Sequence, residues 1–243
     1  VLVDYNEENR LVDLDSLTSD LLWPNHPMGM PIIGKKETIS RMTQQDLLDW
    51  HKQFYKPQNT ILGVTGDFDP AKIIDLVNSE FPKESPESPP IKYQPIEVQA
   101  ENREFLRLVK DMDNQYSFQW SFPNYQLSKE LKVEYELIRR ILDDGNSSRL
   151  QRLIREEKGL VYDISADMTY FSNGAILTVQ SMVGISRLEE LMAALIELIE
   201  GLMEKGVTEE EFRLAKSRYK SALECSIDSA QGVLYNHLAP MLY

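Results

Sequence analysis

The chain has 243 residues, 42% hydrophobic and 27% charged, so it is long enough to bury a sizeable core. It has 26 basic and 39 acidic residues, which gives a net charge of −13. A chain this acidic lacks the cationic surface that binds phosphates. We therefore expect no nucleic-acid partner and no membrane partner. The single cysteine, Cys225, excludes an internal disulfide and a metal site built from several cysteines.

Neither apolar runs nor chain ends point to a membrane anchor. The longest apolar helix pattern, RLEELMAALIELIEGLM, is interrupted by glutamates and cannot supply the roughly 20 apolar residues that cross a bilayer. We expect a soluble protein, and the sequence does not decide between the cytoplasm and the periplasm.

The chain starts without methionine and stops at LAPMLY without a closing signal, so we expect a piece of a longer protein.

Residues 1–81 alternate helical patterns with turn-rich stretches. Apolar residues at 11, 14, 17, 21 and 22 predict a helix, and the proline-rich PNHPMGMPIIG predicts an irregular segment. Thr43 with Asp46 is typical of a helix start. The apolar side of that helix would contain Leu47, Leu48, His51, Phe54 and Tyr55. NTILGVTGDF, residues 59–68, predicts a short strand, and Asp69-Pro70 predicts a helix to about Phe81.

A linker is predicted at 82–100, because residues 82–95 contain five prolines. In residues 101–243, the alternating REFLRLV and YSFQWSFP predict two strands, followed by a helix from Ser128 to about Leu142. A short helix, a strand through Tyr170 and a strand over 174–183 come next. Ser186 with Glu189, and Thr208 with Glu211, predict capping boxes for two more helices. This order predicts an α+β fold, an antiparallel sheet with helices packed on it.

Metal binding is not supported by the three histidines, His26, His51 and His237, because none has a second histidine four positions away. We interpret His26 as a loop residue and His51 as a core residue, and we expect no complete zinc site. Neither VTGDFD nor DDGNSS matches a phosphate-binding loop. The pair Asp143 and Asp144 is interpreted as solvated loop charge.

Arg155 and Tyr162 stand at the two ends of REEKGLVY. Spacing alone leaves two interpretations open. The arginine pairs with a helix neighbour and the tyrosine fills a strand position, or both side chains contact a ligand.

Two long stretches change this balance. LDDGNSSRLQRLIREEKGLVYDISADMTYFSNGAILTVQSMV resembles the second half of the pitrilysin/insulinase family of zinc peptidases, with a small-residue turn, Ser-Arg-Leu, an arginine helix and Gly-Leu-x-Tyr. HPMGMPIIGKKETISRMTQQDLLDWHKQFYKPQNTILGVTGDFDP resembles the stretch that closes the family's first half. The resemblance covers nearly the whole chain in the correct order.

The resemblance implies two similar α+β halves, joined by a linker, that enclose a chamber for peptides. Residues 1–81 would close the first half, 82–100 would be the linker, and 101–243 would be the front part of the second half. The family holds zinc with an inverted His-x-x-Glu-His helix and a downstream glutamate, and this sequence contains no such motif. By the family pattern the helix is expected well before Val1 and the glutamate at or just before Val1. Asp4, the nearest acidic residue inside the chain, is not assigned as a zinc ligand. The resemblance also implies that Arg155 and Tyr162 contact the substrate near the zinc.

The expected function is therefore that of a fragment of a zinc-dependent endopeptidase that cleaves extended peptides, with zinc in the full-length protein and none in the fragment, which alone would be inactive. The alternative is a non-catalytic scaffold or processing-complex subunit of the same fold. Expected partners are a peptide or unfolded polypeptide substrate and the missing N-terminal zinc-bearing region. We also expect residues 43–81 to cover an edge of the second sheet, within one chain or in a strand-exchanged dimer.

Overall fold

The computed structural model describes residues 14–24, 26–81, 110–111, 115–125, 128, 131–171 and 174–242. These residues form two compact units, one containing those from 14 to 33 and from 110 to 221, the other those from 34 to 81 and from 222 to 242. The boundary falls inside helix α8 (Glu209–Ser226). The predicted linker at 82–100 and the predicted strand REFLRLV lie outside the described residues.

The larger unit is built on an antiparallel sheet with the strand order β1-β2-β4-β3. The strands are β1 (Lys110–Asp111), β2 (Gln115–Asn124), β3 (Ile164–Tyr170) and β4 (Ala175–Gly184). The register places Val179 of β4 opposite Trp120 of β2 and opposite Ala166 of β3. Because side chains alternate along a strand, these three residues share one face of the sheet. The turn at 172–173 lies outside the described residues.

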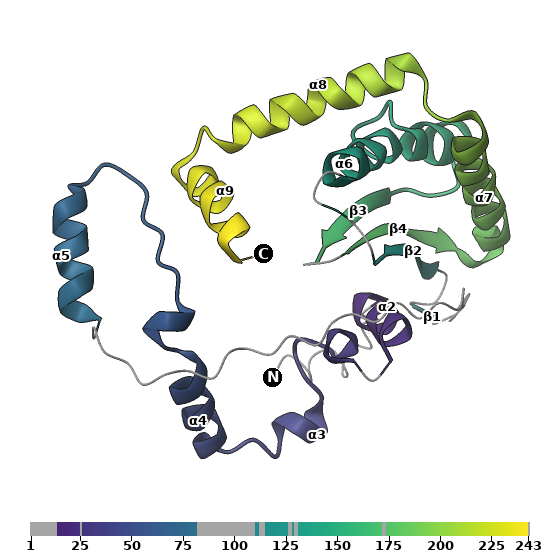
Figure 1. Cartoon of the computed structure of the whole chain (residues 1–243). Helices are drawn as coiled ribbons and strands as arrows, with labels where there is room; N and C mark the ends of the chain where they lie inside the picture. Colours follow the sequence, from purple (N-terminus) through teal and green to yellow (C-terminus); the bar gives the residue numbers. More distant parts are fainter. Residues whose placement is uncertain are drawn as a thin grey trace. The chain divides into compact units, whose positions relative to one another are not determined.

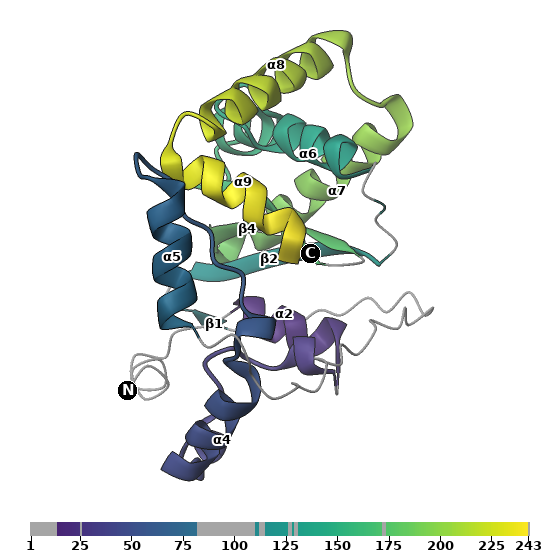
Figure 2. The same ribbon diagram turned by 60° about the vertical axis from the view of Figure 1, so that its left-hand side comes forward.

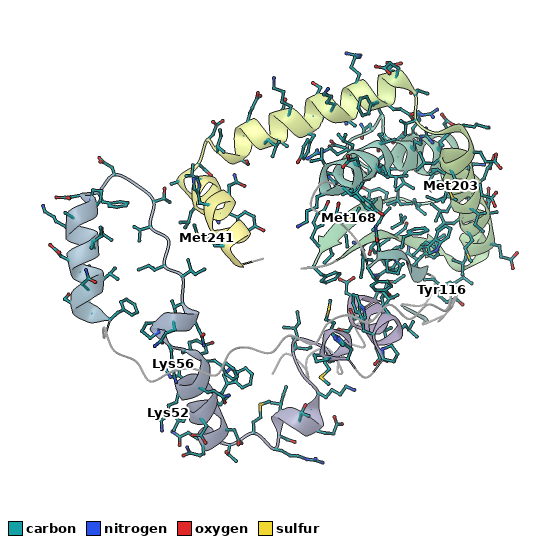
Figure 3. All side chains as sticks on the ribbon, in the orientation of Figure 1. Lys52, Lys56, Tyr116, Met168, Met203 and Met241 are labelled. Carbon is teal, nitrogen blue, oxygen red and sulfur yellow. The ribbon has the colours of Figure 1, made fainter. Side chains whose placement is uncertain are left out.

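Helices α6 (Leu131–Leu142) and α7 (Leu188–Lys205) pack on that face, whereas α2 (Leu14–Leu22) lies on the other side (Figures 1 and 2). Gln119 donates a hydrogen bond to Asp15 of α2 at 3.1 Å, and Trp23 meets Phe171 edge to face. Side chains crowd the space between the sheet and the helices in Figure 3, where Met168 is labelled. The buried core contains Leu142, Leu150, Ile154, Leu160, Val161, Ile164, Ala166, Val179, Val183, Leu191, Ala194, Leu195 and Leu198.

These elements confirm the predicted α+β fold, and one of the two predicted capping boxes in this unit forms. Thr208 Oγ1 accepts from Glu211 N (3.2 Å), while the Glu211 carboxylate accepts from Thr208 N (2.8 Å). The box predicted at Ser186 and Glu189 is wrong. Residues Ile185–Arg187 form a 3-10 turn, η4, so α7 begins later, after Arg187.

Other helix predictions in this unit are close. The helix predicted from 11 to 22 is observed as α2, and the helix predicted from Ser128 is observed from Leu131 as α6. The proline-rich stretch after α2 is irregular apart from one 3-10 turn, η1 (Pro27–Gly29). No helix among the described residues is long and apolar enough to cross a membrane.

The smaller unit contains α3 (Lys36–Ile39), α4 (Gln44–Phe54), η2 (Pro57–Asn59), α5 (Pro70–Glu80) and α9 (Ala230–Leu242). The predicted starts of α4 and α5 are confirmed, because Thr43 Oγ1 accepts from Asp46 N and the Asp69 side chain accepts from Ala71 N. Neither helix contains a buried residue. At Gly63, an added Cβ would lie 2.5 Å from Leu234 Cδ1, so the backbone there lies against α9.

The strand predicted at 59–68 is wrong for the described chain. Residues 57–59 form the turn η2, and residues 60–65 have no strand partner, because all four strands of the sheet come from residues 110–184. A strand requires a neighbour to complete its backbone hydrogen bonds. Coverage of the sheet edge by residues 43–81 within one chain stays a prediction, because these residues and the sheet belong to different units. The strand-exchanged dimer stays a prediction.

Candidate functional site

The segment between α6 and β3 carries both residues predicted to contact a substrate. The short helix predicted there is a π-helix, η3 (Leu150–Glu157), and a turn at Gly159 follows it with a φ of +56°. A hydrogen bond from Leu160 N to Ile154 O (3.0 Å) folds the chain back at this end. Ile154 is fully buried, whereas its neighbour Arg155 keeps 38% of its side chain exposed. The helix therefore anchors itself in the core and presents Arg155 at the surface.

Arg155 and Tyr162 lie together in the structure. The guanidinium carbon of Arg155 lies 6.0 Å from the centroid of the Tyr162 ring, at the outer limit of a cation–π contact. Tyr162 is 89% exposed, and its hydroxyl makes no hydrogen bond to any residue that the structure describes. Arg155 Nε lies 3.7 Å from Glu156 Oε1, a loose ion pair. The tyrosine precedes β3 and fills no core position, so its phenol is free to meet a ligand.

The backbone on both sides of Tyr162 is fastened to other elements. Arg187 Nη1 donates to Gly159 O at 2.6 Å, and Ser181 Oγ donates to Asp163 O at 2.6 Å. These bonds link the loop to the start of α7 and to β4. An exposed side chain on a fastened backbone is suited to recognition, because little chain entropy is lost when a ligand binds.

A further ion pair fixes the start of η3. Arg149 donates to Glu211 from Nε (2.7 Å) and Nη2 (2.8 Å), and Nη2 also donates to Gly206 O (2.9 Å). The hydrogen bond from Arg149, followed by those from Thr208, lowers the pKa of the Glu211 carboxyl to about 2. The same pairing raises the pKa of Arg149. The arginine of Ser-Arg-Leu thus joins η3 to α8 and stays away from the candidate site.

The interpretation of Asp143 and Asp144 as solvated loop charge is wrong. Asp144 accepts from Arg140 Nη1 at 2.7 Å, and Asp143 accepts from Ala166 N at 2.9 Å and from Gln151 Nε2 at 3.1 Å. Both carboxylates therefore serve the packing of α6. Sequence reasoning also missed Gln151, whose only signal was a polar residue beside the buried Leu150 and four positions before Arg155.

The three histidines make local contacts. His26 caps the turn η1 by accepting from Met28 N, as expected of a loop residue, whereas the prediction that His51 is a core residue is wrong. His51 is exposed and stacks on Tyr55, with ring centroids 4.9 Å apart. Among the described residues, no three histidine, cysteine, aspartate or glutamate side chains form a group that could hold a metal ion. No ligand for zinc is therefore assigned to this part of the chain.

Comparison with known proteins adds a family relationship. Residues 41–219 match the family model described as the peptidase M16 inactive domain. The chain is 25% identical over 219 residues to the uncharacterized zinc protease YmxG of Bacillus subtilis, an alignment that covers 88% of this chain and 52% of YmxG. The chain spans about half the length of the curated relatives it matches.

Two solved structures share the fold at low sequence identity. The peptidase M16 inactive domain from Pseudomonas fluorescens superposes with a TM-score of 0.76 at 18% identity, over 96% of this chain and 56% of that one. A chain of Complex III2 from Candida albicans superposes with a TM-score of 0.74 at 17% identity, over 97% of this chain and 58% of that one. At such identities the likeness shows the fold alone.

Proposed function

Because the chain belongs to the peptidase M16 inactive-domain family, we propose that it forms the substrate-facing wall of a two-part zinc peptidase. The match to the family model confirms, at the level of the family, the resemblance to zinc peptidases of the pitrilysin/insulinase family. Zinc is proposed for the longer protein only, with ligands supplied from outside this chain. The boundaries 1–81, 82–100 and 101–243 remain our proposal for how the chain divides between the two halves.

The observation that carries the proposal is the pair formed by Arg155 and the exposed Tyr162. A guanidinium and a phenol hydroxyl both donate hydrogen bonds, and an extended peptide offers carbonyl oxygens at regular intervals. Peptide hydrolysis makes one of these oxygens negative, so a donor that already points at it stabilises the transition state more than the ground state. In this proposal Tyr162 donates to the reacting carbonyl and Arg155 holds the neighbouring backbone.

The alternative is a non-catalytic scaffold of the same fold, in which the same two donors would bind a peptide without cleavage. The fold does not separate the two functions. The pairing of Arg155 with the exposed Tyr162 favours the peptidase, because a phenol beside a guanidinium can donate to the oxygen that becomes negative during cleavage.

The test is a Tyr162→Phe variant of the longer protein, assayed with an extended peptide. We expect kcat to fall about 10- to 100-fold with a smaller change in KM, because the lost donor acts on the transition state. Tyr235→Phe, on an exposed tyrosine of α9, is the matched control and should leave kcat unchanged. An unchanged kcat in Tyr162→Phe would remove the proposed role. Cleavage by this chain alone that a chelator abolishes would contradict the assignment of zinc to another region.

A further inference from the structure

Gln151 is a buried amide that bonds to Arg155 of the candidate site and to the backbone at Ile164, close in sequence to Tyr162. Only 8% of it is exposed, and its Nε2 donates to Ile164 O at 2.6 Å and to Asp143 Oδ1 at 3.1 Å. A carbonyl and a carboxylate are both acceptors, so only the NH₂ end of the amide can face them. The Oε1 end must therefore point the other way, and the orientation of the side chain follows from its neighbours.

Asp143 holds this arrangement from the far side. One carboxylate oxygen accepts from Gln151, and the other accepts from Ala166 N at 2.9 Å. Asp143 follows directly after α6, and Ala166 lies in β3. The carboxylate thus links the end of a core helix to a core strand, which gives the amide a fixed base.

The free end of the amide reaches Arg155. Gln151 Oε1 accepts from Arg155 Nη1 at 3.4 Å, a long hydrogen bond to a charged donor. The other end of the same amide holds Ile164 O, two residues after Tyr162. A single side chain therefore contacts the guanidinium of Arg155 and the backbone that leads from Tyr162 into the sheet.

We infer that Gln151 is a positioning residue, which fixes Arg155 relative to Tyr162. Its effect on peptide hydrolysis rests on the proposed function, whereas its effect on Arg155 does not. Without Oε1, the contacts that the guanidinium keeps with described residues are the loose pair with Glu156 at 3.7 Å and the face of the Tyr162 ring at 6.0 Å. A donor with several competing orientations is less often aligned with a substrate oxygen.

A buried amide that only satisfies its own hydrogen bonds would look similar, so the test must report on Arg155 itself. Gln151→Met keeps the length of the side chain and removes both ends of the amide. In this chain, we expect hydrogen exchange at the Arg155 Nη1 protons, which donate to Gln151 Oε1, to accelerate about 5-fold when measured by NMR, the factor that corresponds to one net hydrogen bond. Gln180→Met is the control: it removes an amide of β4 that donates to Asp167 of β3, and it should leave the Arg155 signal unchanged.

A reciprocal measurement covers the case in which Gln151→Met does not fold. Arg155→Gln changes a partly exposed side chain, and it should shift the side-chain amide resonances of Gln151 in an otherwise native spectrum. If Arg155→Gln leaves the Gln151 amide unshifted, the inference is overturned.

Turnover by the longer protein separates this inference from the proposed function. Gln151→Met should lower kcat/KM about 3- to 10-fold with Arg155 present and have little effect in an Arg155→Gln background. An equal loss in both backgrounds would mean a purely structural role for Gln151 and would overturn the inference. If the Arg155 signal responds to Gln151→Met while Arg155→Gln has full turnover, the positioning stands and the proposed role of Arg155 fails.

Discussion

Helix α7 in the larger unit buries Leu191, Leu195 and Leu198, whereas α4 in the smaller unit leaves Leu47, Leu48 and Trp50 exposed. Both helices have apolar residues at helical spacing. The difference is the surface opposite them: α7 faces a sheet, while α4 has no buried residue at all. An apolar stripe in the sequence indicates that a helix packs against another surface, but it does not identify that surface.

The same contrast holds for strands. Residues 164–170 pair with β4 along their whole length, but residues 60–65, with Ile61, Leu62 and Val64 exposed, pair with no described strand. The chain spans about half the length of its curated relatives.

The largest expected effect comes from truncating matched leucines in the two units. Leu195→Ala should destabilise the larger unit by about 3 kcal/mol, because it opens a cavity in a packed core. Leu47→Ala, at a side chain 63% exposed, should change stability by less than about 0.5 kcal/mol. Hydrogen exchange of β3 and β4 peptides, and of α4 peptides, measures each unit separately. Comparable losses at both positions would mean that α4 is packed in solution.

A smaller, pH-dependent effect distinguishes two capping boxes of the same design. The pKa of Glu211 is lowered to about 2 by the hydrogen bond from Arg149, and that of Asp46 is lowered by the hydrogen bond from Thr43, at a fully exposed site. A carboxyl with a depressed pKa stabilises the fold above its ordinary pKa of 4.5, and this contribution disappears as the pH falls towards 2.

Glu211→Gln should therefore lower the free energy of unfolding by about 1.5 kcal/mol at pH 6. This value is reduced for solvent screening, because 26% of the Glu211 side chain is exposed. The difference from wild type should shrink steadily between pH 5 and pH 2. Asp46→Asn should give a smaller loss with the same sign. Urea unfolding at several pH values measures both, and a pH-independent loss in Glu211→Gln would show that the ion pair contributes nothing.

Features that depend on neighbouring residues were predicted correctly from the sequence. Features that depend on residues distant in sequence were not. The helix starts at Thr43, Asp69 and Thr208 depend on atoms within three residues, so the sequence predicts them. The strand at 59–68 depends on a neighbour that the described chain does not contain. Helix α7 begins later than predicted, because Arg187 donates to Gly159 O and to the Glu190 carboxylate. The contact with Gly159 depends on a turn that is distant in sequence.

The candidate site divides in the same way. Arg155 and Tyr162 follow from a resemblance in sequence, and their proximity in the structure is consistent with it. Gln151 could not be found, because its role depends on Asp143 and on Ile164 O, which only the fold brings to it. A polar residue in a buried helix is visible in a sequence, but its partners are not.

The smallest expected effect tests a close contact inside the smaller unit, at Gly63. In Gly63→Ala the new Cβ would lie 2.5 Å from Leu234 Cδ1 and 2.7 Å from Leu238 Cδ1, so the ends of both leucine side chains must shift. We expect a loss of about 1 kcal/mol, seen as faster hydrogen exchange in α9. Gly201→Ala in α7 is the matched substitution, because nothing lies within 4 Å of the new Cβ. It should stabilise α7 by about 0.5 kcal/mol, since alanine loses less backbone entropy in a helix. If Gly63→Ala were also neutral or stabilising, the segment would not pack on α9, and the smaller unit would depend entirely on surfaces outside this chain.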